Sequence, residues 1–569
     1  MYFYDTILLL RIIMKTLLLG INSKYIHPNV AIRLLKANCD FEVDLKEFNI
    51  KDKIENIYNY IVDNRYDIIG ISCYIWNIEL INQLLIKLKE LNITIILGGP
   101  EVSYNTSYYI DKGLCHYVIK NEGEEAFNLL LHYLNNEISI DEIPNLYHKD
   151  GFTFDKLVDI SKLKMAYHLL DDIKNKIIYI ETSRGCPFKC GYCMASLDNK
   201  LRFFDIEEIK KEVLILINKG GRVFKFLDRT FNANKKNFIS LIDFIILNHK
   251  EGNSFQFEIT GDLLDDDIIS YINRHAPKNL FRFEIGIQST NIKANKAVYR
   301  IQNNEKLFHN VRLIQDSNII DLHLDLIAGL PYEDYNSFIN TFNEVLSLRP
   351  KELQLGFLKL LKGTKLYSEK EMYGYKFNQQ APYDIISNNF LSIEDINNIH
   401  IVEDAFEKFY NKTTFKKAIN YILDNISNPF EFFFNLGSNK IPSSTLEETF
   451  KYLNDYVKDN INLNYDKFHQ LLILDYLNYH NIKPSIWWDE KLSTSDRNIL
   501  LREIFKTHKI TNDINILYKY SLVIPLKENL IIAIYKDNKK EIHIIKNYKK
   551  QNKSTSFLLI LNSFRLYII

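Results

Sequence analysis

The chain has 569 residues, which is too long for a single hydrophobic core and predicts several domains. Hydrophobic residues make up 46% of it and charged residues 25%, an ordinary composition for globular proteins. Lysine plus arginine and aspartate plus glutamate each number 71, so the formal charge is zero and gives no reason to expect nucleic acid or an anionic membrane as a partner.

The first apolar run of the chain, residues 8–19, does not predict a membrane span. Arg11 and Lys15 interrupt it, and it is shorter than the roughly 18 residues that a transmembrane helix needs. No small-residue cleavage site follows, so a signal peptide is not expected either. We expect the first domain to begin at Met14 and residues 1–13 to be a dispensable extension.

Residues 15–135 alternate short apolar runs with longer amphipathic stretches. The apolar runs, which predict strands, are 16–19, 68–72, 93–97 and 117–119, and the helix-like stretches are 28–37, 52–63, 77–90 and 124–135. This alternation predicts a doubly wound parallel sheet, an α/β fold that binds ligands at the carboxyl ends of its strands. Ser72, Gly98 and Gly99 lie at those ends, and the two glycines allow backbone to approach a bulky ligand.

A second alternation predicts a partial (β/α)6 barrel over residues 173–375, after a linker of little periodicity at 136–172. Its apolar runs are 177–182, 223–227, 255–259, 281–287, 322–327 and 353–358. The chemistry of such a barrel lies at the carboxyl ends of its strands. Residues 376–569 are predicted to form a mainly helical C-terminal domain, with two β-like runs at 529–535 and 541–546.

Three of the six cysteines lie in one short loop directly after the strand at 177–182. Cys186, Cys190 and Cys193 have the spacing C-x3-C-x2-C, and thiolates are the ligands that iron–sulfur clusters select. Three ligands leave one iron of a four-iron cluster open to a small molecule. The other cysteines are scattered and are expected to be buried free thiols, so we expect a reducing, cytoplasmic location.

Two other interpretations of the cysteine loop remain open at this point. A structural zinc ion would need a fourth protein ligand, and His168, which precedes the loop by 18 residues, is a poor candidate. An electron-transfer cluster without catalysis is the other alternative.

The loop resembles the signature of the radical S-adenosylmethionine (SAM) superfamily, in which an aromatic residue before the third cysteine contacts the adenine. Tyr192 occupies that place. The resemblance implies a [4Fe-4S] cluster held by Cys186, Cys190 and Cys193, with SAM bound to it. It also implies an electron donor such as flavodoxin or ferredoxin.

Polar residues at the later strand ends agree with this resemblance. Asp228 stands where the superfamily usually has a Gly-Gly-Glu segment that binds the SAM amino group. The glycines are absent here, so the resemblance implies only that the Asp228 carboxylate takes the functional place of that glutamate. A carboxylate such as Glu258 can accept hydrogen bonds from ribose hydroxyls. Gln288 and Ser289 resemble the polar residues that line the SAM pocket.

The order of the domains resembles radical SAM proteins that carry a cobalamin (B12)-binding domain, in an uncharacterised branch with its own helical C-terminal domain. The resemblance implies cobalamin at Ser72, Gly98 and Gly99. Cobalamin domains often use an Asp-x-His-x-x-Gly loop, but His27 has no Asp two residues before it and no Gly three after it. We therefore expect His27 to cap a helix or pack between domains, and loss of cobalamin binding remains an alternative.

The resemblance implies an enzyme that reductively cleaves SAM to start radical chemistry, with cobalamin-dependent methyl transfer to a small-molecule or peptide substrate as the leading interpretation. A radical rearrangement or oxidation without methyl transfer is the first alternative. A redox sensor that binds SAM and cobalamin without turnover is the second, and the polar ends of all six barrel strands argue against it. No nucleic acid or membrane partner is expected.

Overall fold

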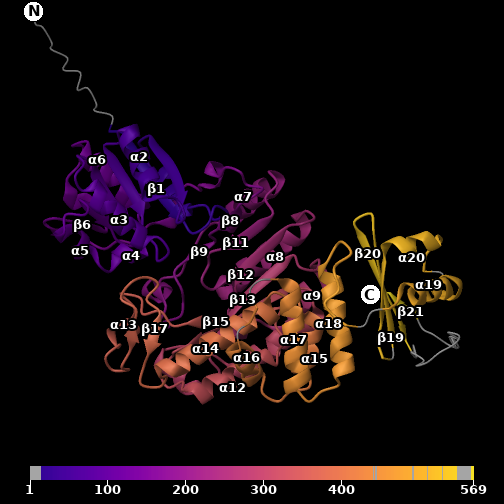
Figure 1. The fold of residues 1–569 in the computed structure, drawn as a ribbon. Helices are drawn as coiled ribbons and strands as arrows, with labels where there is room; N and C mark the ends of the chain where they lie inside the picture. Colours follow the sequence, from indigo (N-terminus) through magenta and orange to yellow (C-terminus); the bar gives the residue numbers. More distant parts are fainter. Residues whose placement is uncertain are drawn as a thin grey trace, which may run out of the picture. The chain divides into compact units, whose positions relative to one another are not determined.

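The computed structural model describes residues 14–439, 441–442, 445–489, 492–508, 510–527, 529–546 and 566–568. The chain divides into two compact units, Met1–Ile396 and Asn397–Ile569 (Figure 1). The boundary predicted at residue 376 therefore falls inside the first unit. The predicted extension 1–13 lies outside the described residues.

The first unit begins with a seven-stranded sheet in the order β2-β1-β3-β4-β5-β6-β7. Its parallel strands are β1 (Thr16–Asn22), β2 (Val43–Asn49), β3 (Ile68–Ser72), β4 (Thr94–Gly98) and β5 (Tyr117–Ile119). Its helices are α1 (Val30–Ala37), α2 (Ile54–Asn64), α3 (Ile78–Leu88), α4 (Pro100–Ser103), α5 (Thr106–Asp111) and α6 (Glu124–Leu134). The doubly wound sheet that the alternation predicts is present.

Both faces of this N-terminal sheet are apolar and buried. Every residue of β1 and β3 is buried. Leu17 and Leu19 pack on one face with residues of α2 and α3, and Leu18 packs on the other with residues of α1 and α6. Because helices cover both faces, only the ends of the strands are open to a ligand.

Two features of this sheet differ from the sequence prediction. The pattern does not predict β2, because charged residues break its apolar run, yet β2 pairs in parallel with β1 along its whole length. Within the stretch 136–172, predicted as a linker, two short strands extend the sheet: β6 (Leu146–His148) pairs antiparallel with β5, and β7 (Gly151–Phe152) pairs antiparallel with β6.

The second sheet of the first unit has six parallel strands in the order β15-β14-β13-β12-β11-β8. They are β8 (Ile177–Ile180), β11 (Val223–Phe226), β12 (Ser254–Glu258), β13 (Phe281–Gln288), β14 (Asp321–Ala328) and β15 (Glu352–Phe357). The helices that alternate with them are α7 (Ile206–Asn218), α8 (Lys235–Asn248), α9 (Asp266–His275), α10 (Ile292–Ala297), α11 (Asn304–Ser317) and α12 (Tyr335–Leu346). This is the partial (β/α)6 barrel that the sequence predicts.

The two faces of the barrel sheet differ. Along β13, Phe281, Phe283 and Ile285 are buried, whereas the alternate residues Arg282 and Glu284 are only partly buried. One face therefore belongs to the apolar core, and the other carries polar side chains.

The second unit is mainly helical, as predicted, and ends in an antiparallel sheet. Its helices are α15 (Lys416–Leu423), α16 (Pro429–Ser438), α17 (Leu446–Asn460), α18 (Tyr465–Tyr479), α19 (Thr494–His508) and α20 (Ile514–Tyr520), and α14 (Ile393–Phe406) spans the boundary between the units. The sheet contains β18 (Ser521–Pro525), β19 (Asn529–Lys536), β20 (Lys539–Lys546) and β21 (Leu566–Ile568). No helix among the described residues is both long and apolar enough to cross a membrane.

Candidate functional site

The cysteine loop leaves the barrel after β8 and is closed at its base by a short antiparallel pair. β9 (Ser183–Arg184) pairs with β10 (Arg202–Phe203). Gly185 has a positive φ of 87°, and a Cβ there would lie 2.6 Å from the carbonyl oxygen of Lys200. Only glycine fits this position, because an L side chain would clash with backbone. The conformation that leads into Cys186 is therefore fixed by the fold.

The three loop cysteines lie in a shielded environment. Cys186 and Cys190 are buried and Cys193 is partly buried. Burial raises the pKa of the Cys193 thiol, the charge of Arg229 lowers it, and the neighbouring Cys190 and Cys186 raise it. The three thiols are thus close enough to influence one another.

Among the described residues, no three His, Cys, Asp or Glu side chains converge in the geometry of a bound metal ion. The cluster assignment to Cys186, Cys190 and Cys193 therefore stays a prediction. The donor set fits a cluster in kind, because three soft thiolates on one loop are what iron–sulfur clusters bind.

Arg300 contacts this loop and was missed by the motif analysis. Its Nη1 lies 3.3 Å from the hydroxyl oxygen of Tyr192 and 3.9 Å from Sγ of Cys190, and its Nη2 donates to the carbonyl oxygen of Gly286. The guanidinium therefore places a positive charge beside Cys190. Arg300 follows α10, far from the cysteines in sequence, and no local pattern marks it.

Asp228 is 1% exposed, and both oxygens of its carboxyl group accept hydrogen bonds from the protein. Its Oδ1 accepts hydrogen bonds from the hydroxyls of Thr182 and Ser183, both at 2.5 Å, and its Oδ2 accepts one from the Thr182 amide at 3.0 Å. Burial raises the pKa of Asp228 to about 6, although these hydrogen bonds oppose the shift. In this structure Asp228 fixes the start of the cysteine loop, and its contact with the SAM amino group stays a prediction.

The other predicted SAM residues differ in how available they are. The side-chain Oε1 of Gln288 is buried and has no hydrogen-bond partner in the structure. The hydroxyl of Ser289 is fully buried and donates to Glu333. Glu258 ends β12 with its carboxylate 3.6 Å from Arg229, and its side chain is 33% exposed. The Oε1 of Gln288 is thus buried but unpaired and the Glu258 carboxylate is partly exposed, whereas the Ser289 hydroxyl is already hydrogen-bonded within the protein.

Polar side chains also line the partly buried polar face of the barrel sheet, and sequence reasoning missed most of them. Lys225 lies 3.2 Å from Glu284, which also accepts from Gln256. His323 lies 2.8 Å from Asp325. Burial lowers the pKa of His323, but the hydrogen bonds that its ring donates to the Asp325 and Glu352 carboxylates raise it to about 9. The alternation of polar and apolar residues along the strands is the signal that could have identified this face.

At the carboxyl edge of the N-terminal sheet, the two predicted glycines have different roles. A Cβ at Gly99, where φ is 112°, would lie 2.4 Å from the Cys73 carbonyl oxygen, so the fold itself requires this glycine. A Cβ at Gly98 would meet only the Ile119 carbonyl oxygen, at 3.7 Å. Nothing in the protein forbids a side chain at Gly98, so its absence leaves room for a ligand.

Ser72 and two aromatic residues complete this edge. The Ser72 hydroxyl accepts a hydrogen bond of 2.7 Å from Nδ2 of Asn29. Tyr74 and Trp76, which follow β3, stack with ring centroids 4.4 Å apart and planes 7° apart, and Trp76 is 44% exposed. This flat apolar surface beside Ser72 was not predicted, and it suits a planar ring system.

His27 packs between the two sheets of the first unit, as its broken motif led us to expect. Its Nδ1 lies 2.6 Å from the hydroxyl oxygen of Tyr179 on β8, and the two rings stack. Burial lowers the pKa of His27, and the charges of Lys24 and Lys225 lower it further.

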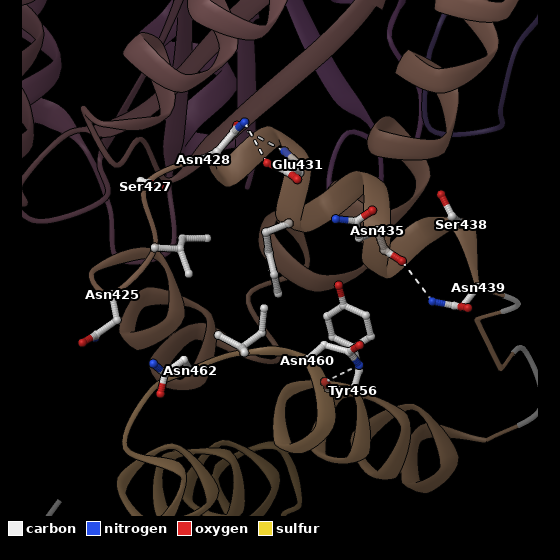
Figure 2. Close-up of a pocket in the computed structure, with 13 residues that line it drawn as sticks. Asn425, Ser427, Asn428, Glu431, Asn435, Ser438, Asn439, Tyr456, Asn460 and Asn462 are labelled. Carbon is white, nitrogen blue, oxygen red and sulfur yellow. Dashed lines mark hydrogen bonds between the residues drawn. The ribbon is translucent and has the colours of Figure 1, made fainter.

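The second unit contains a groove of about 620 Å³ between α16 and α17, which holds none of the predicted site residues (Figure 2). Several of its asparagine side chains form hydrogen bonds with nearby backbone groups. The Asn428 side chain accepts one from the Glu431 amide. The side chains of Asn439 and Asn460 donate to the carbonyl oxygens of Asn435 and Tyr456. These amides complete helix ends, so we assign the groove no chemistry.

Three family models match successive parts of the chain. The B12 binding domain matches residues 16–131, the radical SAM superfamily matches residues 180–345, and a protein family of unknown function, DUF4080, matches residues 371–559. The first two matches cover the five parallel strands of the N-terminal sheet and most of the barrel with its cysteine loop.

Curated relatives and a solved structure agree with these families. An uncharacterized methyltransferase of Pyrococcus horikoshii is 28% identical over 26% of this chain and 36% of its own length. The cobalamin-dependent radical SAM methyltransferase TokK of Streptomyces tokunonensis is 22% identical over 54% of this chain and 50% of its own length. The chain thus spans half or less of the length of these relatives.

The structure of the cobalamin-dependent SAM radical enzyme OxsB with aqua-cobalamin bound superimposes with a TM-score of 0.56 and 15% identity, covering 82% of this chain and 81% of OxsB. At that identity the likeness establishes the fold alone. The C-terminal region matches the DUF4080 family model, and the two matched domains before it identify the chain as a radical SAM protein with an N-terminal B12-binding domain.

Proposed function

We propose that this protein is a cobalamin-dependent radical SAM methyltransferase that acts on a small-molecule or peptide substrate and receives electrons from a separate protein such as flavodoxin or ferredoxin. One observation carries the proposal: side chains at the carboxyl edge of the N-terminal sheet form hydrogen bonds with barrel residues close to the cysteine loop. His27 contacts Tyr179, and Glu124 contacts Arg184, two residues before Cys186. A ligand at the carboxyl edge of the N-terminal sheet and a ligand at the cysteine loop of the barrel would therefore lie close to each other.

The residues that would hold the cofactors suit them in kind. Cys186, Cys190 and Cys193 would hold a [4Fe-4S] cluster, and the unpaired Oε1 of Gln288 would accept a hydrogen bond from SAM. The open position at Gly98, with the exposed face of Trp76 nearby, would accommodate the corrin ring of cobalamin. When bound, the reduced cluster supplies the electron that cleaves SAM, and cobalamin supplies a methyl carrier.

The protein's own residues would bind, orient and shield the reactants. Arg300 would place a positive charge beside Cys190 and hold the Tyr192 ring where an adenine could contact it. The polar face of the barrel, which includes Glu258 and Glu284, would orient polar groups of SAM and substrate. Burial of the loop would limit access of water to reactive species.

The test is the product pattern of the anaerobically reconstituted protein. Methyl transfer on this plan uses two SAM molecules per product, so we expect equal amounts of 5′-deoxyadenosine and S-adenosylhomocysteine when substrate is present. With no substrate, dithionite should still release 5′-deoxyadenosine slowly. Deoxyadenosine without any S-adenosylhomocysteine, while cobalamin is bound, would contradict methyl transfer and favour a rearrangement or oxidation. Bound cofactors with no SAM cleavage would favour a sensor.

A further inference from the structure

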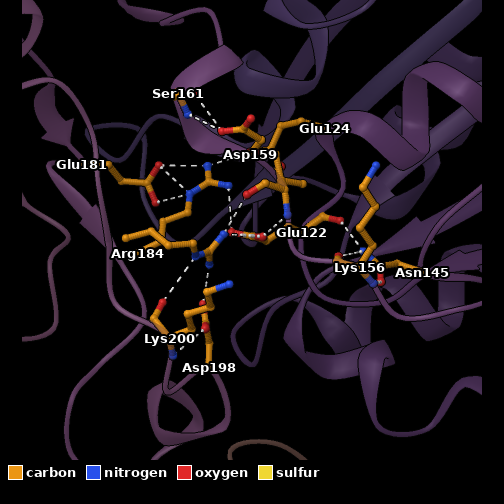
Figure 3. Close-up of polar contacts among 12 residues, drawn as sticks. Glu122, Glu124, Asn145, Lys156, Asp159, Ser161, Glu181, Arg184, Asp198 and Lys200 are labelled. Atoms are coloured by element: carbon orange, nitrogen blue, oxygen red, sulfur yellow. Dashed lines mark hydrogen bonds and ion pairs between the residues drawn. The ribbon is translucent and has the colours of Figure 1, made fainter.

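A buried network of charges joins the N-terminal sheet to the base of the cysteine loop (Figure 3). At its centre, the Arg184 guanidinium contacts three carboxylates. Its Nη2 lies 2.7 Å from Glu124 and 3.1 Å from Glu181, and its Nη1 lies 3.2 Å from Glu122. Glu122 and Glu124 come from the B12-binding domain, and Glu181 comes from the end of β8.

A second arginine extends the network to the far side of the same loop. Nη1 of Arg202 lies 2.9 Å from Glu122, and its Nη2 lies 2.6 Å from Asp198. Glu122 therefore bridges Arg184 and Arg202, which sit on the two paired strands that close the loop.

These side chains are shielded from water, so their charges depend on one another. The side chains of Arg184, Glu124 and Glu122 are 10%, 7% and 15% exposed. Burial opposes ionisation of Glu122, but hydrogen bonding to Arg202 and the charge of Arg184 bring its pKa below the usual range. Separating a buried charge from its ion-pair partner costs several kcal/mol, about 3–5. If one of these carboxylates moved, the arginine would therefore follow it.

The network reaches Cys186 from both sides. Arg184 is separated from Cys186 only by Gly185, whose conformation the Lys200 carbonyl fixes. The Cys186 amide donates to the carbonyl oxygen of Asp198 at 2.9 Å, and the Asp198 carboxylate is bound by Arg202. A shift of either arginine is therefore transmitted to the backbone of this cysteine.

At its other end, the network reaches the edge where a doubly wound sheet binds its ligand. Glu122 and Glu124 flank Gly123, which joins the carboxyl end of β5 to α6. One oxygen of Glu124, Oε2, is buried and has no hydrogen-bond partner in the structure. Glu124 therefore contacts Arg184 through Oε1 and has a second acceptor oxygen that no other group occupies.

We infer that Arg184 is a positioning residue that couples occupancy of the carboxyl edge of the N-terminal sheet to the geometry of the loop that carries Cys186, Cys190 and Cys193. The inference rests on the proposed function, because it requires a cluster on the loop and cobalamin at the edge. It adds that cobalamin changes the state of the cluster through Glu122, Glu124 and Arg184.

The experiment compares the full-length wild-type protein with the Glu124→Gln and Glu125→Gln variants after anaerobic reconstitution. Glu125 is the matched control, because it lies in the same turn of α6 but pairs with Lys156, at 2.5 Å, and is not in contact with Arg184. The readouts are iron content, cobalamin absorbance, the electron paramagnetic resonance spectrum of the reduced cluster, and the rate of SAM cleavage with and without hydroxocobalamin.

In the wild type and in Glu125→Gln, cobalamin should shift the spectrum of the cluster and change the rate of SAM cleavage about tenfold. Glu124→Gln should keep its iron and bind cobalamin but lose both responses. If Glu124→Gln fails to fold, Arg184→Lys replaces it in the experiment. Lysine keeps the positive charge but cannot contact Glu122 and Glu124 through two separate nitrogens, so both responses to cobalamin should weaken while the iron content stays unchanged.

A Glu124→Gln protein that responds to cobalamin like the wild type would overturn the inference. A wild-type protein that holds iron and cobalamin but shows no response would also overturn it, and would leave the proposed function standing. A wild-type protein that holds no iron or no cobalamin would instead defeat the proposed function.

Discussion

The first unit contains two parallel sheets that use their strands differently. In the N-terminal sheet, β1 and β3 are buried throughout because helices cover both faces, so a ligand can reach only the strand ends. In the barrel sheet, strands such as β13 alternate buried and partly buried residues, so one whole face is polar in addition to the ends. Under the proposed function, this difference suits a ligand bound at the edge of the N-terminal sheet and reactants bound against the polar face of the barrel.

The largest effect is expected at the cysteine loop, where the proposed cluster would bind. Replacing any one of Cys186, Cys190 or Cys193 by Ala should abolish SAM cleavage and the visible absorbance of the reconstituted protein, because a four-iron cluster held by three thiolates loses an essential ligand. Cys73→Ala, at a buried thiol of the N-terminal sheet, is the control and should keep both signals. Full SAM cleavage by a loop variant would disprove the assignment.

A core substitution in the N-terminal sheet should reduce stability. Ile69 on β3 is fully buried, so Ile69→Ala should lower the free energy of unfolding by about 2–5 kcal/mol, measured by denaturant titration. The cost arises because a helix-covered sheet leaves the resulting cavity unfilled. A loss below about 1 kcal/mol would mean that this face is less tightly packed than the structure indicates.

Two glutamates at the edges of the two sheets should give opposite pH dependences. In the N-terminal sheet, burial opposes ionisation of Glu47, but hydrogen bonds from Arg33 and Asn29 lower its pKa to about 2. In the barrel, burial raises the pKa of Glu333 to about 7 against hydrogen bonds from Ser289 and Thr341. Glu47 therefore stabilises the fold above about pH 4.3, the value in an unfolded chain, and this contribution is lost as the pH falls towards 2.

Glu333 contributes in the opposite direction. Its protonated form is favoured in the folded protein, so its contribution is complete below about pH 4.3 and is lost as the pH rises through 7, by up to about 4 kcal/mol. Thermal melting of Glu333→Gln should lack the decline in stability between pH 5 and 8, and Glu47→Gln should lack the decline at acid pH. Identical profiles for wild type and Glu333→Gln would show that this carboxyl stays ionised.

A smaller effect is expected from the partly exposed face of the barrel. Glu258→Gln should raise the KM for SAM about tenfold, the loss of about 1.4 kcal/mol expected when a hydrogen bond to a charged acceptor is weakened. Its melting temperature should change little, because the Arg229 contact is partly exposed and weak. An unchanged KM would remove Glu258 from the predicted SAM site.

The smallest structural effect is expected at Gly98. Gly98→Ala should leave the melting temperature unchanged within about a degree, since its Cβ would meet only one atom at contact distance, but it should weaken cobalamin binding several-fold. Gly99→Ala is the matched comparison and should be clearly destabilising, because φ is 112° and Cys73 backbone lies in the way. Unaltered cobalamin affinity in Gly98→Ala would place the corrin elsewhere.

The sequence predicted the fold well where apolar runs are continuous and poorly where they are not. The run at 68–72 corresponds closely to β3, because a strand buried on both faces contains little but apolar residues. The run at 281–287 corresponds closely to β13, because every second residue is apolar and buried. β2 was missed because its exposed edge position admits Asp44, Lys46 and Glu47 into the strand. Local pattern thus identifies central strands more readily than edge strands.

The candidate site shows the same division. The cysteine loop is visible in sequence because its residues are adjacent, whereas the contacts of Arg300 with Cys190 and of Arg184 with Glu124 join residues more than 50 positions apart. Asp228 was predicted from a strand-end motif, but its hydrogen bonds to Thr182 and Ser183 depend on the pairing of β11 with β8. Such contacts follow from the tertiary fold.

The central claim is that one chain holds a four-iron cluster on the barrel and cobalamin at the edge of the N-terminal sheet. The most direct test is the iron and cobalt content of the anaerobically reconstituted protein, measured for the wild type and for the triple Cys186, Cys190 and Cys193→Ala variant after removal of unbound cofactors. We expect about four irons and one cobalt per wild-type chain, and one cobalt but no cluster iron in the variant. A wild-type chain without cobalt, or a triple variant that retains its iron, would contradict the account.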